Sequence, residues 1–186
     1  MKVAVIHKVK AIDDETFNFL AKYEPKFSEE NEVQRAINSF TILWMIFEQY
    51  FFDKNPPPHT SQSDQITNIV KKWSSSNPLI DNFWTTELLY FKNRYIKTNG
   101  GTTDYFRKLQ LSSEYYKTYV KKVLSGESNA PKDILTALLY IILRFRNNLL
   151  HGTKWPSGMD QKENFDTCSS LLRSCLERFK YNAETN

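Results

Sequence analysis

Four polar side chains suited to phosphodiester chemistry lie close together in the last third of the chain. Arg146, Asn147, Asn148 and His151 occur in one short run, which is followed by Gly152. A guanidinium can hold phosphate oxygens, an imidazole can transfer a proton near neutral pH, and an amide can hydrogen-bond a phosphate or orient the imidazole. No pair of carboxylates accompanies them in the sequence. The run therefore predicts phosphodiester chemistry that uses neither a metal nor a cofactor.

The helix that must position these side chains is apolar on most of its faces. It is expected to begin at Pro131, which suits a first helical turn, and to end with His151 in its last turn and Gly152 beyond it. The negative carbonyl end of a helix favours a protonated imidazole. On an unbroken helix, Arg146 and His151 would be about 140° apart and would not share a face. Their convergence requires either the helix end at Gly152 or a second copy of the chain.

The run Arg146, Asn147, His151 and Gly152, at the end of an apolar helix, resembles the signature of the HEPN superfamily, in which an arginine precedes a histidine by a few residues. The aromatic segment 40–48 is similar to the first core helix of many members. The resemblance covers about residues 29–181. It implies an all-α, HEPN-like helical bundle with a four-helix up-down core and additional helices. Members are usually dimers, and many are metal-independent endoribonucleases found as toxins, anti-phage factors and CRISPR effector nucleases.

This resemblance implies a separate catalytic role for each motif residue. The ribose 2′-hydroxyl would attack the adjacent phosphate, with His151 as general base or acid. Arg146 would stabilise the charge of the transition state, and Asn147 would orient either group. Two motif helices would meet across a two-fold axis. The expected partners are RNA, with tRNA as one candidate, a second copy of the chain, and an antitoxin or regulatory protein.

Two further side chains are candidates for supporting the motif. Asn148 adds a second amide beside Arg146. Glu48 lies near the apolar face of the helix expected up to about residue 51, where an unpaired carboxylate would be costly. Glu48 either pairs with Arg144 or Arg146 or lies at the solvent edge, and the sequence leaves both alternatives open.

Basic and aromatic residues alternate along two shorter helices expected near 103–110 and 113–124. Such mixtures can bind single-stranded nucleic acid through charge and stacking, although they also fit an ordinary amphipathic surface. The basic residues are Arg107, Lys108, Lys117, Lys121 and Lys122.

The whole chain has the size of one domain, residues 1–186, and a mild excess of positive charge. Its net charge of +4 is compatible with a polyanionic partner but does not require one. Cys168 and Cys175 are expected to be core residues in a reducing cytoplasm. No signal peptide or membrane span is expected. Residues 1–28 are expected to form an arm and a short helix, and 29–181 the core bundle.

The remaining helices follow from periodicity and from caps. Ser63 or Asp64 is expected to cap a helix that ends near Trp73, and the next helix should end at Asn99–Gly101. A last helix is expected over 161–181. The apolar stripe of the first core helix is broad enough for two contacts, one of them with another protomer. A second hypothesis is a non-catalytic helical module that binds RNA, a nucleotide or a protein partner.

Overall fold

The computed structural model describes residues 22, 32–76, 79, 83–150 and 160–179. Within these ranges it contains seven α-helices and no strand, so the predicted all-α helical bundle is confirmed. No described helix is long and apolar enough to cross a membrane. Except for Lys22, the predicted N-terminal arm and short helix lie outside the described residues. The helices are α2 (Glu32–Phe51), α3 (Gln62–Ser76), α4 (Thr85–Tyr95), α5 (Asp104–Leu109), α6 (Glu114–Ser125), α7 (Pro131–Leu150) and α8 (Asp160–Phe179).

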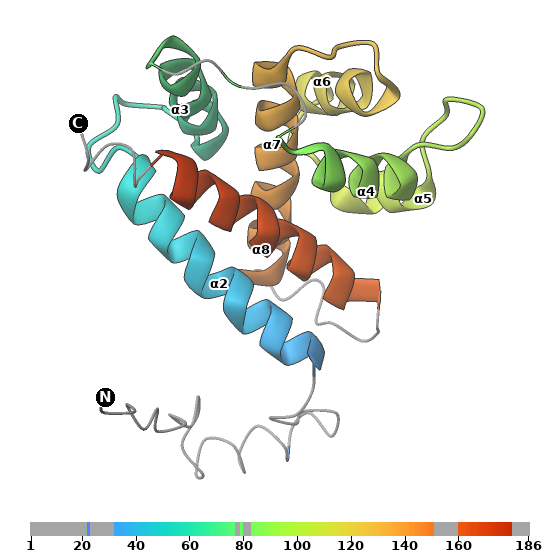
Figure 1. The fold of residues 1–186 in the computed structure, drawn as a ribbon, viewed down its shortest axis with the longest axis horizontal. Coiled ribbons are helices and arrows are strands. Elements are labelled where there is room, and N and C mark those ends of the chain that lie inside the picture. Colours follow the sequence, from blue (N-terminus) through green and yellow to red (C-terminus); the bar gives the residue numbers. More distant parts are fainter. Residues whose placement is uncertain (1–21, 23–31, 77–78, 80–82, 151–159, 180–186) are drawn as a thin grey trace, which may run out of the picture.

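Helices α2 and α8 pack side by side and run in the same direction (Figure 1). Lys162 Nζ lies 3.9 Å from a carboxylate oxygen of Glu32, so the two helices start near each other. Further along, the rings of Phe40 and Phe165 are 5.2 Å apart. Parallel neighbours require a long connection, which residues 52–159 provide. The parallel direction of α2 and α8 differs from the predicted up-down order of the core, in which neighbouring helices alternate in direction.

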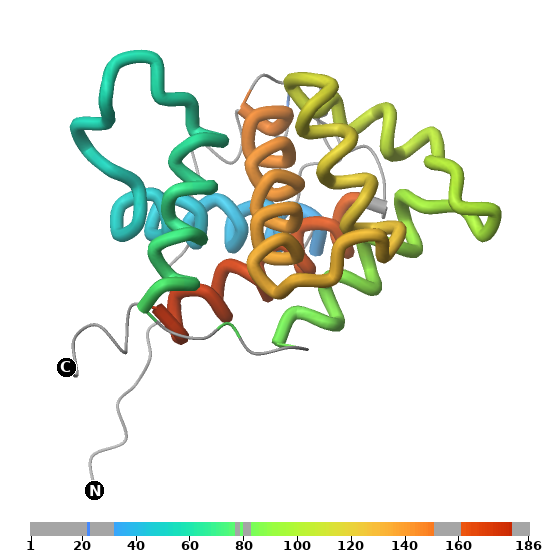
Figure 2. The backbone as a smooth tube through the Cα atoms, turned by 90° about the horizontal axis from the view of Figure 1, so that it is seen from above, coloured from blue at the N-terminus to red at the C-terminus, as the bar shows by residue number. Residues whose placement is uncertain are grey.

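Helix α7 stands between α3 and α6 (Figure 2). All of its residues from Leu135 to Leu143 are buried, which confirms the prediction that the motif helix is covered on most sides. On one side, the hydroxyls of Thr67 in α3 and Tyr140 lie 2.6 Å apart. On the other side, the ring of Tyr116 in α6 contacts that of Tyr140 edge-on, with centroids 4.8 Å apart. Tyr140 therefore joins both neighbours to α7.

A row of aromatic rings links the parallel pair to the rest of the bundle. Phe165 of α8 contacts Phe40 of α2 at 5.2 Å and Phe145 of α7 at 5.9 Å between ring centroids. Phe145 in turn lies 6.3 Å from Phe91 of α4, which stacks on Tyr95 at 5.8 Å. Offset and edge-on aromatic pairs add to the stabilisation that burial itself gives. The end of α7 is thus fixed from two sides by the core.

Helix α3 begins earlier than the sequence predicted. Ser61 precedes its first residue and accepts a hydrogen bond from the backbone N–H of Asp64 at 3.1 Å. In return, Asp64 accepts a hydrogen bond from the backbone N–H of Ser61 at 2.9 Å. This reciprocal arrangement is a capping box. The prediction of Ser63 or Asp64 as the cap was therefore wrong, because Asp64 is the third residue of the helix and Ser61 caps it.

Helix α4 ends earlier than the glycine pair at 100–101 indicated. It stops at Tyr95, whose carbonyl accepts a hydrogen bond from the N–H of Thr103 at 2.9 Å. Between them the chain makes a tight turn in which Gly100 has a φ of +79°, a value that glycine adopts without strain. The predicted end at Asn99–Gly101 was wrong because these residues form a return turn rather than a helix end.

Both cysteines are core residues, as predicted, and so are three tryptophans. Trp44, Trp73 and Trp84 are buried in the hydrophobic core. Cys168 and Cys175 are free thiols without exposed area. Burial raises the pKa of both thiols. They are therefore protonated at neutral pH and act as small apolar groups.

Candidate functional site

Arg146 lies in the last turns of α7 with about a quarter of its side chain exposed. Its Nη2 is 3.6 Å from Oε1 of Glu48, and the exposed fractions of the two side chains are 27% and 28%. Its Nη1 donates a hydrogen bond to Oδ1 of Asn147 at 3.1 Å. The separation from Glu48 exceeds the usual range for an N–H···O hydrogen bond. Glu48 therefore attracts the guanidinium without taking up one of its N–H groups.

Glu48 is fixed by hydrogen bonds to other side chains. Its Oε2 accepts a hydrogen bond from Nε1 of Trp44 at 3.0 Å. Its Oε1 accepts one from Nε2 of Gln62 at 3.0 Å. The carboxylate thus joins α2, the start of α3 and the end of α7. Of the alternatives left open by the sequence, the structure selects pairing with Arg146 rather than with Arg144 or solvent alone.

Asn147 and Asn148 face different surroundings, because consecutive helical residues point about 100° apart. Asn147 is partly exposed and accepts the hydrogen bond from Arg146. Asn148 is buried, with 5% of its surface exposed. Its position indicates that Asn148 supports the packing of α7 and that Asn147 is the amide available at the surface.

Asn148 and Arg144 together hold the end of α5. Asn148 Nδ2 donates to the carbonyl oxygen of Leu109 at 3.5 Å, and Arg144 Nε donates to the same oxygen at 3.3 Å. Arg144 Nη2 also donates to Asn148 Oδ1 at 3.2 Å. Partial burial lowers the pKa of the Arg144 guanidinium. These contacts fasten α5 to α7 close to Arg146 in the sequence.

His151 and Gly152 lie outside the described residues, which reach Leu150 before the chain is described again from Asp160. The predicted position of the imidazole in the last turn, and the left-handed residue after it, therefore stay predictions. The structure brings together Arg146, Asn147 and Glu48 from the predicted site.

Three of the five predicted RNA-binding cations share one pocket of about 480 Å³ between α5 and α6. Arg107, Lys117 and Lys121 line it. Two of them have carboxylate partners on their own helices, since Arg107 lies 2.6 Å from Asp104 and Lys117 lies 3.2 Å from Glu114. Both ion pairs are exposed and weak enough to rearrange around a polyanion.

The two other cations lie outside this pocket. The Nζ of Lys108 is 5.6 Å from the centre of the Tyr105 ring, and Lys122 is exposed on α6. A second pocket, lined in part by Arg94 and Lys97, contains none of the five predicted cations. Nothing in the sequence indicated this pocket, because its lining comes from segments far apart in the chain.

Gln62 is a site neighbour that the sequence did not indicate, and Arg144, expected there only as an alternative partner of Glu48, contacts the Leu109 carbonyl instead. The contact of Gln62 with Glu48 depends on how segment 52–61, which contains Pro56, Pro57 and Pro58, leads from α2 to α3, and no local pattern indicates it. The hydrogen bond from Arg144 to the Leu109 carbonyl could not be predicted from the spacing of side chains either. Comparisons with protein-family models, with curated proteins and with solved structures found no match for the chain.

Proposed function

We propose that the protein is a metal-independent endoribonuclease that acts as a homodimer, in the role of a toxin or an anti-phage nuclease. The observation that carries the proposal is the contact between Arg146 and Glu48. Glu48 holds the guanidinium by charge at 3.6 Å, while the oxygens of Glu48 are already hydrogen-bonded to Trp44 and Gln62. Arg146 is therefore oriented but retains N–H groups for a ligand. A phosphate is the ligand that such a planar fork fits best.

In the proposed reaction, the 2′-hydroxyl of a ribose attacks the adjacent phosphorus. The bond to the 5′-oxygen of the next nucleotide breaks, leaving a 2′,3′-cyclic phosphate and a 5′-hydroxyl. His151 takes the proton of the attacking hydroxyl or supplies one to the leaving oxygen. Arg146 donates hydrogen bonds to the phosphoryl oxygens as negative charge builds up on them. Asn147 keeps the guanidinium in place through its 3.1 Å hydrogen bond.

The surface of α2 supports the proposal of a dimer. Ile42 and Met45 are 58% and 63% exposed and lie three residues apart on α2, so they form a small exposed apolar patch. Residues three apart on a helix are separated by about 60° of rotation, so Ile42, Met45 and Glu48 follow one another around neighbouring faces of α2. A second copy seated on Ile42 and Met45 would lie beside Glu48 and Arg146. The two motif helices could then form one composite cleft.

The experiment that tests the proposal compares wild type with variants on labelled total RNA and tRNA. His151→Ala should lower the cleavage rate by roughly 10²- to 10⁴-fold, because it removes the proton-transfer group. Arg146→Lys should restore little of the activity lost in Arg146→Ala, since an ammonium cannot reproduce the planar fork. Affinity is measured separately on a 2′-deoxy analogue, which lacks the nucleophile. A His151→Ala protein that cleaves like wild type would end the assignment of this motif to ribonuclease chemistry.

A second candidate function is a helical module that binds RNA without cutting it. The α5–α6 pocket favours this candidate, because Arg107, Lys117 and Lys121 line one cavity outside the Arg146 site. In that case wild type shows no cleavage, and Lys117→Gln together with Lys121→Gln weakens RNA binding more than His151→Ala does. The same assay on the 2′-deoxy analogue therefore separates the two functions.

A further inference from the structure

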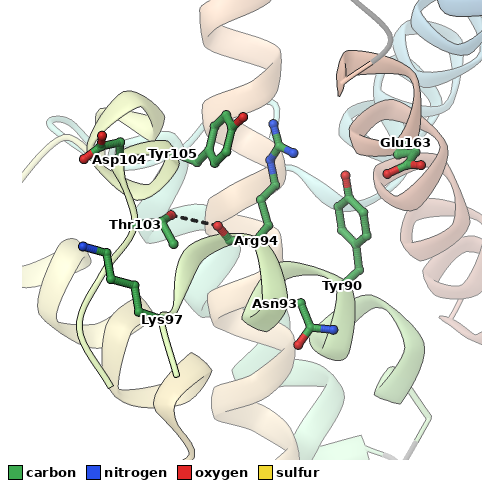
Figure 3. Close-up of a pocket in the computed structure, with 8 residues that line it drawn as sticks. All are labelled: Tyr90, Asn93, Arg94, Lys97, Thr103, Asp104, Tyr105 and Glu163. Atoms are coloured by element: carbon green, nitrogen blue, oxygen red, sulfur yellow. Dashed lines mark hydrogen bonds between the residues drawn. The ribbon is translucent and has the colours of Figure 1, made fainter. Parts of the chain in front are cut away.

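A pocket of about 580 Å³ lies between α4, the start of α5 and the first turn of α8 (Figure 3). Its volume falls within the range of about 300–1,000 Å³ that is usual for small-molecule sites. Arg94, Lys97, Tyr105 and Glu163 are among the residues that line it. None of these side chains belongs to the Arg146 site. Tyr105 lies in the basic and aromatic segment 103–110, but no sequence pattern connects it with Arg94, Lys97 or Glu163.

The middle of the pocket is a stack of a cation on an aromatic ring. The Arg94 guanidinium carbon lies 4.4 Å from the centre of the Tyr105 ring. Thr103 Oγ1 donates a hydrogen bond to the Arg94 carbonyl at 2.8 Å, which ties the start of α5 to α4 and holds the backbone next to Tyr105 (Figure 3). Tyr105 is still 43% exposed. Exposed aromatic rings and guanidinium planes are surfaces on which nucleic-acid bases stack.

The side of the pocket that contains Lys97 attracts an anion. No carboxylate among the described residues forms an ion pair with Lys97 or Arg94, whereas Asp104, which also lines this side, is paired with Arg107 at 2.6 Å. That hydrogen bond and the charge of Arg107 lower the pKa of the Asp104 carboxyl. Lys97 also acts on Asp104 by charge, and the Arg94 side chain hydrogen-bonds Tyr95. Neither cation is neutralised by a carboxylate ion pair among the described residues, so both keep a positive charge that attracts a phosphate.

The opposite side of the pocket carries the reverse charge. Glu163, in the first turn of α8, lies across the Arg94 side chain from Lys97 (Figure 3). A carboxylate repels phosphate and accepts hydrogen bonds from N–H groups, such as those on the edges of nucleobases. The pocket therefore has a positively charged end and a negatively charged end, which would determine the orientation of a bound ligand.

From this arrangement we propose that the pocket binds one nucleotide unit. The phosphate lies at Arg94 and Lys97, and the base lies against the stack of Tyr105 and Arg94 with its N–H edge toward Glu163. The unit is either a free nucleoside monophosphate or one nucleotide of an RNA strand, because both present the same chemistry. The inference does not rest on the ribonuclease proposal, since a site that binds without cleaving would have the same geometry.

The test is isothermal titration of the full chain with three kinds of probe. They are the four nucleoside monophosphates with their parent nucleosides, inorganic phosphate, and a single-stranded 2′-deoxy oligonucleotide. Lys97→Gln should weaken binding of the nucleotide-containing probe by roughly tenfold, because one charged contact is lost. Tyr105→Ala should also weaken it by about tenfold, while Tyr105→Phe keeps the ring and stays within about twofold of wild type. Lys92→Gln is the matched control, an exposed lysine on α4 outside the pocket lining.

Each outcome decides one point. Binding of the monophosphates that Lys97→Gln and Tyr105→Ala weaken supports a site for free nucleotides. Binding of the oligonucleotide alone, with the same two losses, supports a site for one nucleotide of a strand. The proposal is overturned if no probe binds, if inorganic phosphate binds as tightly as the nucleotides, or if Lys92→Gln matches Lys97→Gln. Circular dichroism of each variant checks its fold, and Glu163→Gln provides a second readout by changing the order of preference among the four bases.

Discussion

The ion pair between Glu48 and Arg146 can be measured by a double-mutant cycle. At the observed 3.6 Å, Coulomb's law gives about 1 kcal/mol in water and about 4–5 kcal/mol at an effective dielectric constant of about 20. Both side chains are a little over a quarter exposed, and some hydration is lost on pairing. We therefore expect a net coupling free energy of roughly 1–2 kcal/mol, between the values for exposed and fully buried pairs.

The cycle uses Glu48→Gln, Arg146→Met and the double variant, with free energies of unfolding from urea titration. Glutamine keeps the size of Glu48, and its oxygen can still accept the hydrogen bond from Trp44. Its NH2 replaces the oxygen that accepts from Gln62, and the Gln62 amide can turn its own oxygen toward that NH2. Methionine keeps much of the aliphatic stem of Arg146. The matched control is the pair of Glu32 and Lys162, which are 3.9 Å apart and 68% and 38% exposed. Its coupling should be below about 0.5 kcal/mol.

The same variants separate a positioning role of Glu48 from the direct role proposed for Arg146. Arg146→Met should lower the rate of RNA cleavage by roughly 10²- to 10³-fold, because donors to the phosphoryl oxygens are lost. Glu48→Gln should cost only about tenfold, since those donors remain but are less well oriented. A coupling no larger than that of Glu32 with Lys162, or equal losses of rate in both single variants, would refute this reasoning.

Three further predictions concern packing, pH and metal dependence. Asn148→Ala should lower the free energy of unfolding by about 1–3 kcal/mol because it removes a buried partner of the Leu109 carbonyl, whereas Asn147→Ala should cost less than about 0.5 kcal/mol; urea titration of both compares them. Burial raises the pKa of Tyr140 from its ordinary 10.0 to about 12, so its contribution to stability is complete below pH 10 and is lost as the pH rises toward 12. Tyr140→Phe should therefore make the loss of stability over this interval less steep, as followed by unfolding at stepped pH. RNA cleavage should continue in excess EDTA, and activity that is lost on chelation and restored by a divalent ion would contradict the proposed mechanism.

Periodicity was sufficient to predict the helical class and the buried motif helix. It was not sufficient to tell which of Asn147 and Asn148 is buried. Ile141, Phe145 and Asn148 are spaced four and three residues apart, which places the amide on the same face as two core residues. Asn147 lies one position away from that face and is partly exposed. Spacing alone does not separate the two asparagines, because Asn147 follows the buried Tyr140 and Leu143 by seven and four residues in the same way.

Other features could not be predicted because they depend on contacts between distant segments. Glu48 had two arginines within reach on one helix, and the selection of Arg146 depends on how α2 crosses α7. The parallel direction of α2 and α8 depends on the path that the chain takes between these two helices. The pocket around Arg94 and Tyr105 combines parts of three helices. Local patterns determine which face of a helix is buried, but they do not specify its neighbour.

Helix α5 has six residues, too few to be stable in isolation. Gln110 ends it with a φ of +54°, and the Leu109 carbonyl before it accepts hydrogen bonds from Arg144 and Asn148 of α7. The helix is therefore completed by side chains from another segment, and it should form late in folding, after α7 is in place. In native-state hydrogen exchange, its amides should open together with any loosening of the end of α7. Residues of α5 line both pockets described above. The shape of the pockets therefore depends on the hydrogen bonds that Arg144 and Asn148, which flank Arg146 on α7, donate to the end of α5.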